Sequence, residues 1–79
     1  MARVLLFGRL ADIAGWRERD VAAGTLSELR ATLAALDPDL AEALSGPSVQ
    51  VAVDKALLRG EATLSATSEV AFLPPMSGG

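Results

Sequence analysis

Glu69-Val-Ala-Phe-Leu-Pro-Pro-Met-Ser-Gly-Gly79 is the stretch around which the rest of the chain is organised. Its start, up to Leu73, is short and apolar and predicts a β-strand. Pro74 and Pro75 end that strand, because proline has no N–H for a sheet ladder and a fixed φ. From Pro74 to Gly79, at about 3.3 Å per residue, an extended chain reaches about 20 Å. The stretch therefore predicts a strand followed by a narrow tail that carries the terminal carboxylate.

Composition narrows the range of functions. The chain has 79 residues, enough for one domain, and 51% of them are hydrophobic, which allows a rich core in so small a chain. It has no cysteine and no histidine, so disulfides, imidazole bases and the usual zinc ligands are excluded, and we expect no metal site. Catalysis by this chain alone would rest on carboxylates, Lys55 or hydroxyls. We therefore expect a partner or substrate of an enzyme.

Charge and hydropathy also set expectations about location and partners. The formal net charge of −3 argues against non-specific binding of nucleic acid, which needs a basic surface. No apolar run approaches the roughly 20 residues of a membrane span, and the first residues lack a signal-peptide pattern. We expect a cytoplasmic protein that binds neither nucleic acid nor membrane.

Two strands are predicted before residue 22. Residues 3–7 are apolar on both faces, which is typical of a central strand. Residues 16–21 carry charges that suit a sheet edge. Between them, residues 9–14 predict a short helical turn that ends at Gly15 in the left-handed conformation.

Two consecutive helices are predicted in the middle of the chain. Thr25 and Glu28 have the spacing of a capping box, which indicates the start of a helix. Asp37 and Pro38 then indicate a new N-cap and first helical position, so we expect a break and a second helix over residues 38–44. One apolar stripe is expected to contain Leu26, Leu29, Leu33, Leu36, Leu40 and Leu44.

The remaining residues complete an α+β pattern. Strands are expected at residues 49–53, 56–58 and 69–73, with a turn at residues 54–55 and one more turn near residues 62–64 in an otherwise irregular segment. The last strand must pair in parallel with the first, and the capped helix supplies the crossover that such a pairing needs. This order predicts a β-grasp fold, a mixed sheet wrapped over one main helix.

The end of the chain resembles the C-terminal signature of the small subunit of molybdopterin synthase, a ubiquitin-like sulfur carrier of the MoaD/ThiS superfamily. Residues 70–79 carry that signature; residues 4–10, Gly15 and residues 51–53 match the family's first strand and turn, next glycine and middle strand. The resemblance covers the whole chain and implies the same β-grasp fold. We expect a domain over residues 1–75 and a flexible tail over residues 76–79.

The resemblance implies a chemistry for the tail. An ATP-dependent enzyme adenylates Gly79, sulfur displaces AMP, and the resulting thiocarboxylate donates its sulfur to a pterin precursor in the active site of the large subunit. Gly78 keeps the approach narrow. The chain itself binds no cofactor, and ATP is used by the activating partner. The carrier is then a non-catalytic, sulfur-donating subunit of a hetero-oligomer, expected to be a heterotetramer.

Strand parity predicts a docking surface beside the tail. If Val4, Leu6, Val70 and Phe72 face the helix, the residues between them face away from it. A contiguous apolar patch of this kind is typical of an interface, and the resemblance implies contacts at Phe7, Leu57 and Leu73. The expected partner-binding residues are Leu5, Phe7, Arg9, Leu57, Leu73, Pro74, Pro75, Met76 and Ser77.

Arg9, Lys55 and Trp16 can each be explained without a role in binding. Arg9 and Lys55 either form ion pairs with a partner or are solvated surface charges. Trp16 is expected to cover an edge of the core.

Three departures from the family bear on partner contacts. Residues 66–68 are Ala-Thr-Ser where family members often have an Asp-Gly-Asp turn. Asp54 occupies a position where Asn is common, and Ala11 a position where a basic residue is common.

Alternative functions remain open: a sulfur carrier for thiamine or cysteine synthesis, a ubiquitin-like modifier that forms isopeptide bonds, or a plain binding module.

Overall fold

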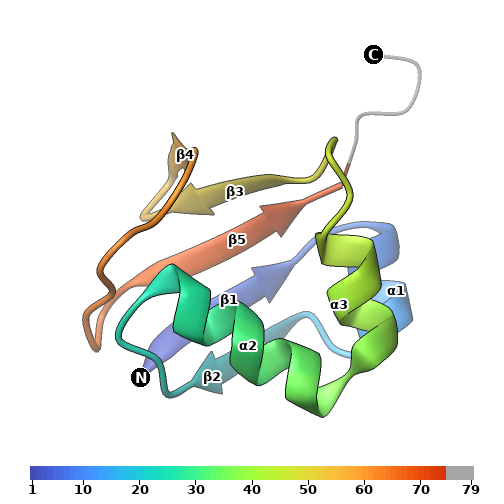
Figure 1. Ribbon diagram of the computed structural model, residues 1–79, viewed down its shortest axis with the longest axis horizontal. Coiled ribbons are helices and arrows are strands. Elements are labelled where there is room, and N and C mark those ends of the chain that lie inside the picture. The colour runs from blue at the N-terminus through green and yellow to red at the C-terminus, as the bar shows by residue number, and fades with distance from the viewer. Residues whose placement is uncertain (75–79) are drawn as a thin grey trace.

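The computed structural model describes residues 1–74, so the predicted tail and Pro75 lie outside the described residues. Within them a five-stranded mixed sheet lies behind helices α2 and α3, with α1 beside α3 at one end (Figure 1). The elements are β1 (Ala2–Leu6), α1 (Arg9–Ala14), β2 (Glu18–Val21), α2 (Leu26–Leu36), α3 (Pro38–Leu44), β3 (Gln50–Val53), β4 (Ala56–Leu58) and β5 (Glu69–Leu73).

The sheet has the order β2-β1-β5-β3-β4. β5 pairs in parallel with β1, and every other neighbouring pair is antiparallel. The predicted parallel pairing of the first and last strands is confirmed, as are the α+β class and the β-grasp fold. β5 thus lies in the middle of the sheet, and the chain leaves the domain from a central strand.

Three strands begin or end at other residues than predicted. β1 ends at Leu6 rather than at Phe7, because Gly8 turns the chain with φ 57° and ψ −135°. β3 begins at Gln50, because the N–H of Val49 donates to Gly46 O at 3.2 Å, within the preceding loop. β2 begins at Glu18 rather than at residue 16, since Trp16 packs against the core instead.

The turn predicted near residues 62–64 is wrong. Thr63 forms an isolated antiparallel bridge with Thr25, and the N–H of Leu64 donates to Gly24 O at 2.9 Å. This stretch is therefore held extended against the entrance to α2. The turn comes later, where the N–H of Ser68 donates to Ser65 O at 3.2 Å.

Both helix starts carry the predicted caps. Thr25 Oγ1 accepts from the N–H of Glu28 at 3.1 Å, and Asp37 Oδ1 accepts from the N–H of Leu40 at 3.2 Å. The carboxylate of Glu28 accepts from the N–H of Gly24 at 2.8 Å, one residue before the position that a capping box normally uses. α1 ends as predicted at Gly15, which has φ 84°.

The leucine stripe is correct except at Leu36. Leu36 is the last residue of α2 and is 53% exposed, and the chain leaves the helical conformation at Asp37, with φ −152°. The buried stripe of α2 therefore ends at Leu33 and resumes on α3 at Leu40. The core otherwise contains the predicted side chains of both helices and the inward face of the sheet, among them Val4, Leu6, Leu26, Leu29, Leu33, Leu40, Leu44, Val51, Val70 and Phe72. Over residues 1–74, none of the helices has the length and apolar character to cross a membrane.

Candidate functional site

The tail leaves the domain from β5 between β1 and β3. Phe72 lies opposite Leu6 on β1, and Leu73 lies opposite Gln50 on β3. Pro74 follows as the last described residue and is half-buried. The predicted site residues that follow Pro74 lie outside the described residues: Pro75, Met76, Ser77, Gly78 and Gly79.

Gly8 lies at this exit, and its role was missed from the sequence. A Cβ on Gly8 would lie 3.1 Å from Cγ of Pro74, tighter than ordinary van der Waals contact. Its φ of 57° is one that L side chains rarely adopt. Sequence reasoning used Gly8 only as the end of a strand, because nothing local shows that the first turn meets the start of the tail.

The outward face of the sheet carries the predicted apolar row. Leu5 lies opposite Ala71, Ala71 opposite Ala52, and Ala52 opposite Leu57, so the four side chains run across β1, β5, β3 and β4. We call Leu5, Phe7, Ala52, Leu57, Ala71 and Leu73 the apolar face. Ala52 was not predicted as a member of this face. Its side chain is buried but is not part of the hydrophobic core cluster, which agrees with its outward position.

Two members of the apolar face are strongly exposed. Phe7 is 46% exposed and Leu57 is 66% exposed, although both are large hydrophobic residues. Leu5 and Leu73 are half-buried beside them. The predicted outward parity is therefore confirmed, and the row continues to the exit of the tail through Leu73.

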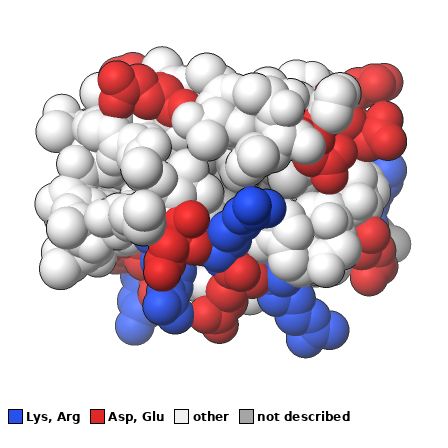
Figure 2. All heavy atoms as spheres, turned by 90° about the horizontal axis from the view of Figure 1, so that it is seen from below, with Lys and Arg blue, Asp and Glu red and all other residues white. Residues whose placement is uncertain are grey.

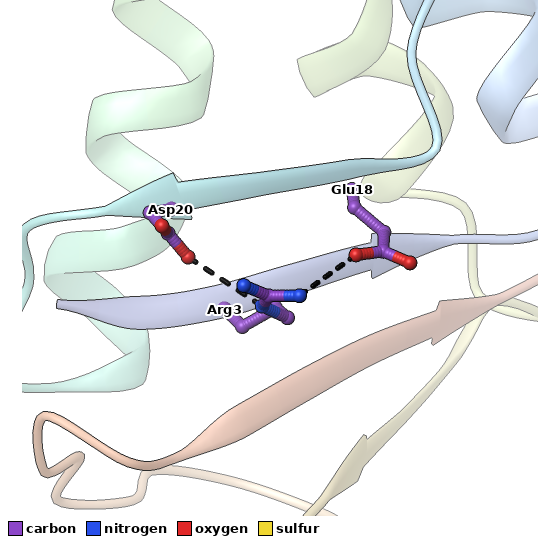
Figure 3. A network of polar contacts seen from close by, with 3 residues as sticks. All are labelled: Arg3, Glu18 and Asp20. Atoms are coloured by element: carbon purple, nitrogen blue, oxygen red, sulfur yellow. Dashed lines mark hydrogen bonds and ion pairs between the residues drawn. The ribbon is translucent and has the colours of Figure 1, made fainter.

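Charged residues border the apolar face on the β2 side. Arg3 Nη1 lies 2.9 Å from Glu18 Oε2, and Arg3 Nε lies 3.6 Å from Asp20 Oδ1 (Figure 3). All three side chains are more than half exposed, so the two ion pairs contribute at most about 1 kcal/mol each. Figure 2 shows that acidic and basic side chains are intermixed on the face seen there and do not form a large patch of one charge.

The two cations singled out from the sequence lie at opposite ends of the sheet. Arg9 begins α1 and lines a surface depression together with Leu5 and Phe7, so the structure brings it beside the apolar face. Lys55 lies in the β3–β4 turn with φ 71°, beyond the end of β3 that is remote from Pro74. Lys55 is therefore not part of the tail exit.

Asp54 has a structural role. Its Oδ1 accepts from the N–H of Glu69 at 2.9 Å, and its own N–H donates to Glu69 O at 2.8 Å. With φ 50° it forms, together with Lys55, the tight turn that the sequence predicted between β3 and β4. These two hydrogen bonds fix the turn to the first residue of β5.

The Ala-Thr-Ser departure is also accounted for by local hydrogen bonds. The buried Ser68 accepts the N–H of Ser65 on its Oγ at 2.8 Å, and its carbonyl accepts the N–H of Arg3 at 2.9 Å. A serine therefore closes this turn and ties it to β1.

Glu61 holds the same connection to the start of α2. Its Oε1 accepts from the N–H groups of Ser27 and Ala62, each at 3.0 Å. Hydrogen bonds from the Ser27 side chain first, and from Ala62 and Ser27 backbone N–H groups next, lower the pKa of the Glu61 carboxyl. Across residues 1–74, no group of three or more acidic side chains is arranged to hold a metal ion.

Comparison with known proteins gives a consistent set of similarities. The model of the ThiS family matches residues 4–79. The molybdopterin synthase sulfur carrier subunit of Escherichia coli (strain K12) is 35% identical over 81 residues, which cover 100% of each chain.

Two solved structures share 26% sequence identity with the chain. SAMP1 from Haloferax volcanii has a TM-score of 0.82 over 99% of this chain and 98% of that one. The complex of subunits 1 and 2 of molybdopterin-converting factor from Helicobacter pylori 26695 contains a chain with a TM-score of 0.77, over 99% of this chain and 97% of that one.

Proposed function

Because this chain belongs to the ThiS family, we propose that it is the sulfur carrier subunit of a molybdopterin synthase. The observation that carries the proposal is the 35% identity to the Escherichia coli carrier subunit over the full length of both chains. The apolar face and the tail exit, adjacent at the end of β5, are the two features that such a carrier requires.

In this proposal the reacting group is the carboxylate of Gly79. A carboxylate is a poor electrophile, so it first attacks the α-phosphorus of ATP in the activating enzyme and releases pyrophosphate. Hydrosulfide, or sulfur delivered at the same oxidation level, then displaces AMP from the acyl adenylate and leaves a thiocarboxylate. The thiocarboxylate sulfur forms a C–S bond to a carbon of the pterin precursor and displaces an oxygen leaving group from it. Water then cleaves the resulting thioester, which leaves the sulfur on the pterin as a thiol and returns the carboxylate of Gly79. A dithiolene requires two such transfers. Because these steps consume ATP, we propose that they take place in the cytoplasm.

The chain contributes positioning to this chemistry. β5 ends at Leu73, on the apolar face, and Pro74 follows it directly where the chain leaves the sheet. Docking of the large subunit on Phe7, Leu57 and Leu73 therefore also fixes the point from which the tail extends. Gly78 adds no side chain, so the tip enters a channel that admits little more than backbone.

We propose that the chain assembles with a second, different subunit. The Helicobacter pylori structure contains two different subunits of molybdopterin-converting factor. A partner of that kind covers the apolar face here, with Arg9 at its rim and with residues 74–77 leading into the partner's active site. We propose a heterotetramer with two copies of each subunit.

Intact mass after co-expression with the activating enzyme tests the carrier mechanism. The expected product is the chain with one oxygen replaced by one sulfur. Adding the large subunit and the pterin precursor must then give the pterin dithiolene and return the chain to its original mass. An unchanged mass in the presence of an active activating enzyme contradicts the proposal.

A ubiquitin-like modifier is the second candidate, favoured by the likeness to the small archaeal modifier protein SAMP1. A modifier would appear in the same co-expression as the chain attached through Gly79 to lysines of other proteins. A carrier for thiamine or cysteine synthesis would form the thiocarboxylate but fail to convert the pterin precursor. One set of measurements therefore separates the three.

A further inference from the structure

A groove with two arginines lies at the β4 edge of the sheet. It has a volume of about 770 Å³, and its lining includes Arg30 from α2, Arg59 after β4, Gln50 from β3 and Leu57 from β4. Among residues 1–74, no acidic side chain lines it. In a chain with a net charge of −3, this is a local concentration of positive charge.

Neither arginine of the groove is neutralised by another described residue. Over residues 1–74 the ion pairs are those of Arg3, and Arg30 and Arg59 have none. Arg30 is half-buried, with its guanidinium 5.3 Å from the centroid of the Phe72 ring, so it is held over the core. Arg59 is exposed. A guanidinium without a carboxylate partner is a natural binding group for a carboxylate from another molecule.

The groove lies on the helix side of β3 and β4 and meets the apolar face at Leu57, at the edge of the sheet. Leu57 belongs to the apolar face and also lines the groove. In the described part of the chain β4 pairs only with β3, so the backbone groups along its outer edge are open to another strand. A partner that covers the apolar face therefore reaches the groove by crossing the edge of β4.

We propose that the groove binds an acidic, extended segment of the protein that docks on the apolar face. The segment pairs with the edge of β4 and presents carboxylates to Arg30 and Arg59. The inference rests on the proposed function only in taking that protein to be the large subunit. The two arginines then contribute to the choice of partner and to the association rate, because charges at the rim of an interface affect specificity and association rate more than affinity.

Association with the cognate large subunit tests the groove. Arg59→Glu is expected to weaken binding about tenfold at low salt, chiefly through a slower association rate. The difference is expected to shrink to about twofold in high salt, because exposed charges are screened. Arg30→Gln is expected to act in the same direction, with a thermal melt to separate loss of charge from loss of the Phe72 contact.

Arg19→Glu is the matched control. Arg19 is an exposed arginine on β2, at the opposite edge of the sheet, where its guanidinium lies 5.8 Å from the centroid of the Trp16 ring. It is expected to change the affinity by less than about twofold. Equal losses for Arg19→Glu and Arg59→Glu, or no loss for Arg59→Glu, overturn the groove as a docking site.

A second experiment keeps the inference distinct from the proposed function. If the wild-type chain does not bind the large subunit, the proposed partner is wrong, and the groove is judged by titrating the labelled chain with a hexaglutamate peptide at low salt. Amide shifts confined to residues 47–51 and 57–60, and lost in Arg59→Glu, support an acidic ligand. No shifts there, or a dimer of the wild-type chain that Arg59→Glu abolishes, overturns the inference.

Discussion

Gly8 lies against the ring of Pro74, where a Cβ on residue 8 would come within 3.1 Å of Pro74 Cγ. The turn that ends β1 therefore lies against Pro74, the residue that follows β5, although the two are at opposite ends of the sequence. Gly8 meets two demands at once: a φ of 57°, and the absence of a side chain at this contact. We expect this contact to set the direction in which the tail leaves the domain.

Gly8→Val is expected to impair sulfur transfer beyond its effect on stability. Gly15→Val is the matched control, because Gly15 also has a positive φ, but a Cβ on it would meet nothing within 4 Å among residues 1–74. Both variants are expected to lose about 1–3 kcal/mol of stability from backbone strain. Assayed below both melting temperatures, only Gly8→Val is expected to transfer sulfur slowly. Equal rates for the two variants would show that the Pro74 contact has no part in positioning.

Phe7→Asp and Leu73→Asp are expected to leave the domain folded and to prevent binding of the large subunit. An unpaired charge buried in the interface costs about 3–5 kcal/mol, or at least about a hundredfold in affinity. Leu36→Asp is the control, because Leu36 is 53% exposed on α2, away from the outward face of the sheet. Calorimetric titration measures all three. Wild-type affinity in both Phe7→Asp and Leu73→Asp would remove the apolar face as the docking surface.

Leu29→Ala and Leu33→Ala are each expected to lower the free energy of unfolding by about 2–5 kcal/mol, because both side chains are buried in the middle of α2. Leu36→Ala, on the same helix, is expected to change it by no more than about 0.5 kcal/mol, as for other surface positions. Urea denaturation compares the three variants. Similar losses at Leu33 and Leu36 would contradict the end of the buried stripe at the break between α2 and α3.

Deletion of Gly79, or addition of one residue after it, is expected to leave the melting temperature unchanged and to abolish sulfur transfer. Deletion leaves the carboxylate about 3.3–3.6 Å short of its site, and misplacement by about 1 Å alone can cost a hundredfold in rate. Gly78→Val keeps the carboxylate in register and tests the width of the channel. The assay is formation of the pterin dithiolene by the reconstituted synthase. Appreciable product from the Gly79 deletion would refute the carrier mechanism.

Glu61→Gln is expected to lower the melting temperature at neutral pH but not in acid. The pKa of Glu61 is lowered in the folded state, first by the hydrogen bond from the Ser27 side chain. Its contribution to stability is therefore present above the pKa of the unfolded chain and is lost as the pH falls through the lower, folded-state pKa. Thermal melts from neutral pH to below the folded-state pKa of Glu61 measure the difference in melting temperature between Glu61→Gln and the wild type. Glu42→Gln, on α3, is the control, and a difference that persists in acid would contradict the linkage.

Most of the fold follows from short-range signals in the sequence. Thr25 with Glu28, and Asp37 with Pro38, place both helix starts, because each signal is a bond or a steric limit within a few residues. The alternation along residues 69–73 fixes which side chains of β5 face the helices, because successive residues of a strand point to opposite faces. The outward position of Leu73 was predictable for that reason.

The tertiary structure alone decided how these pieces meet. The contact of Gly8 with Pro74, the place of Ala52 in the apolar row and the meeting of Arg30 with Arg59 in one groove each join residues distant in the sequence. No local pattern encodes such meetings, because the register between two strands and the direction of a helix after a proline depend on both packed surfaces at once. The sequence thus determined the elements and their faces, and packing determined which faces adjoin.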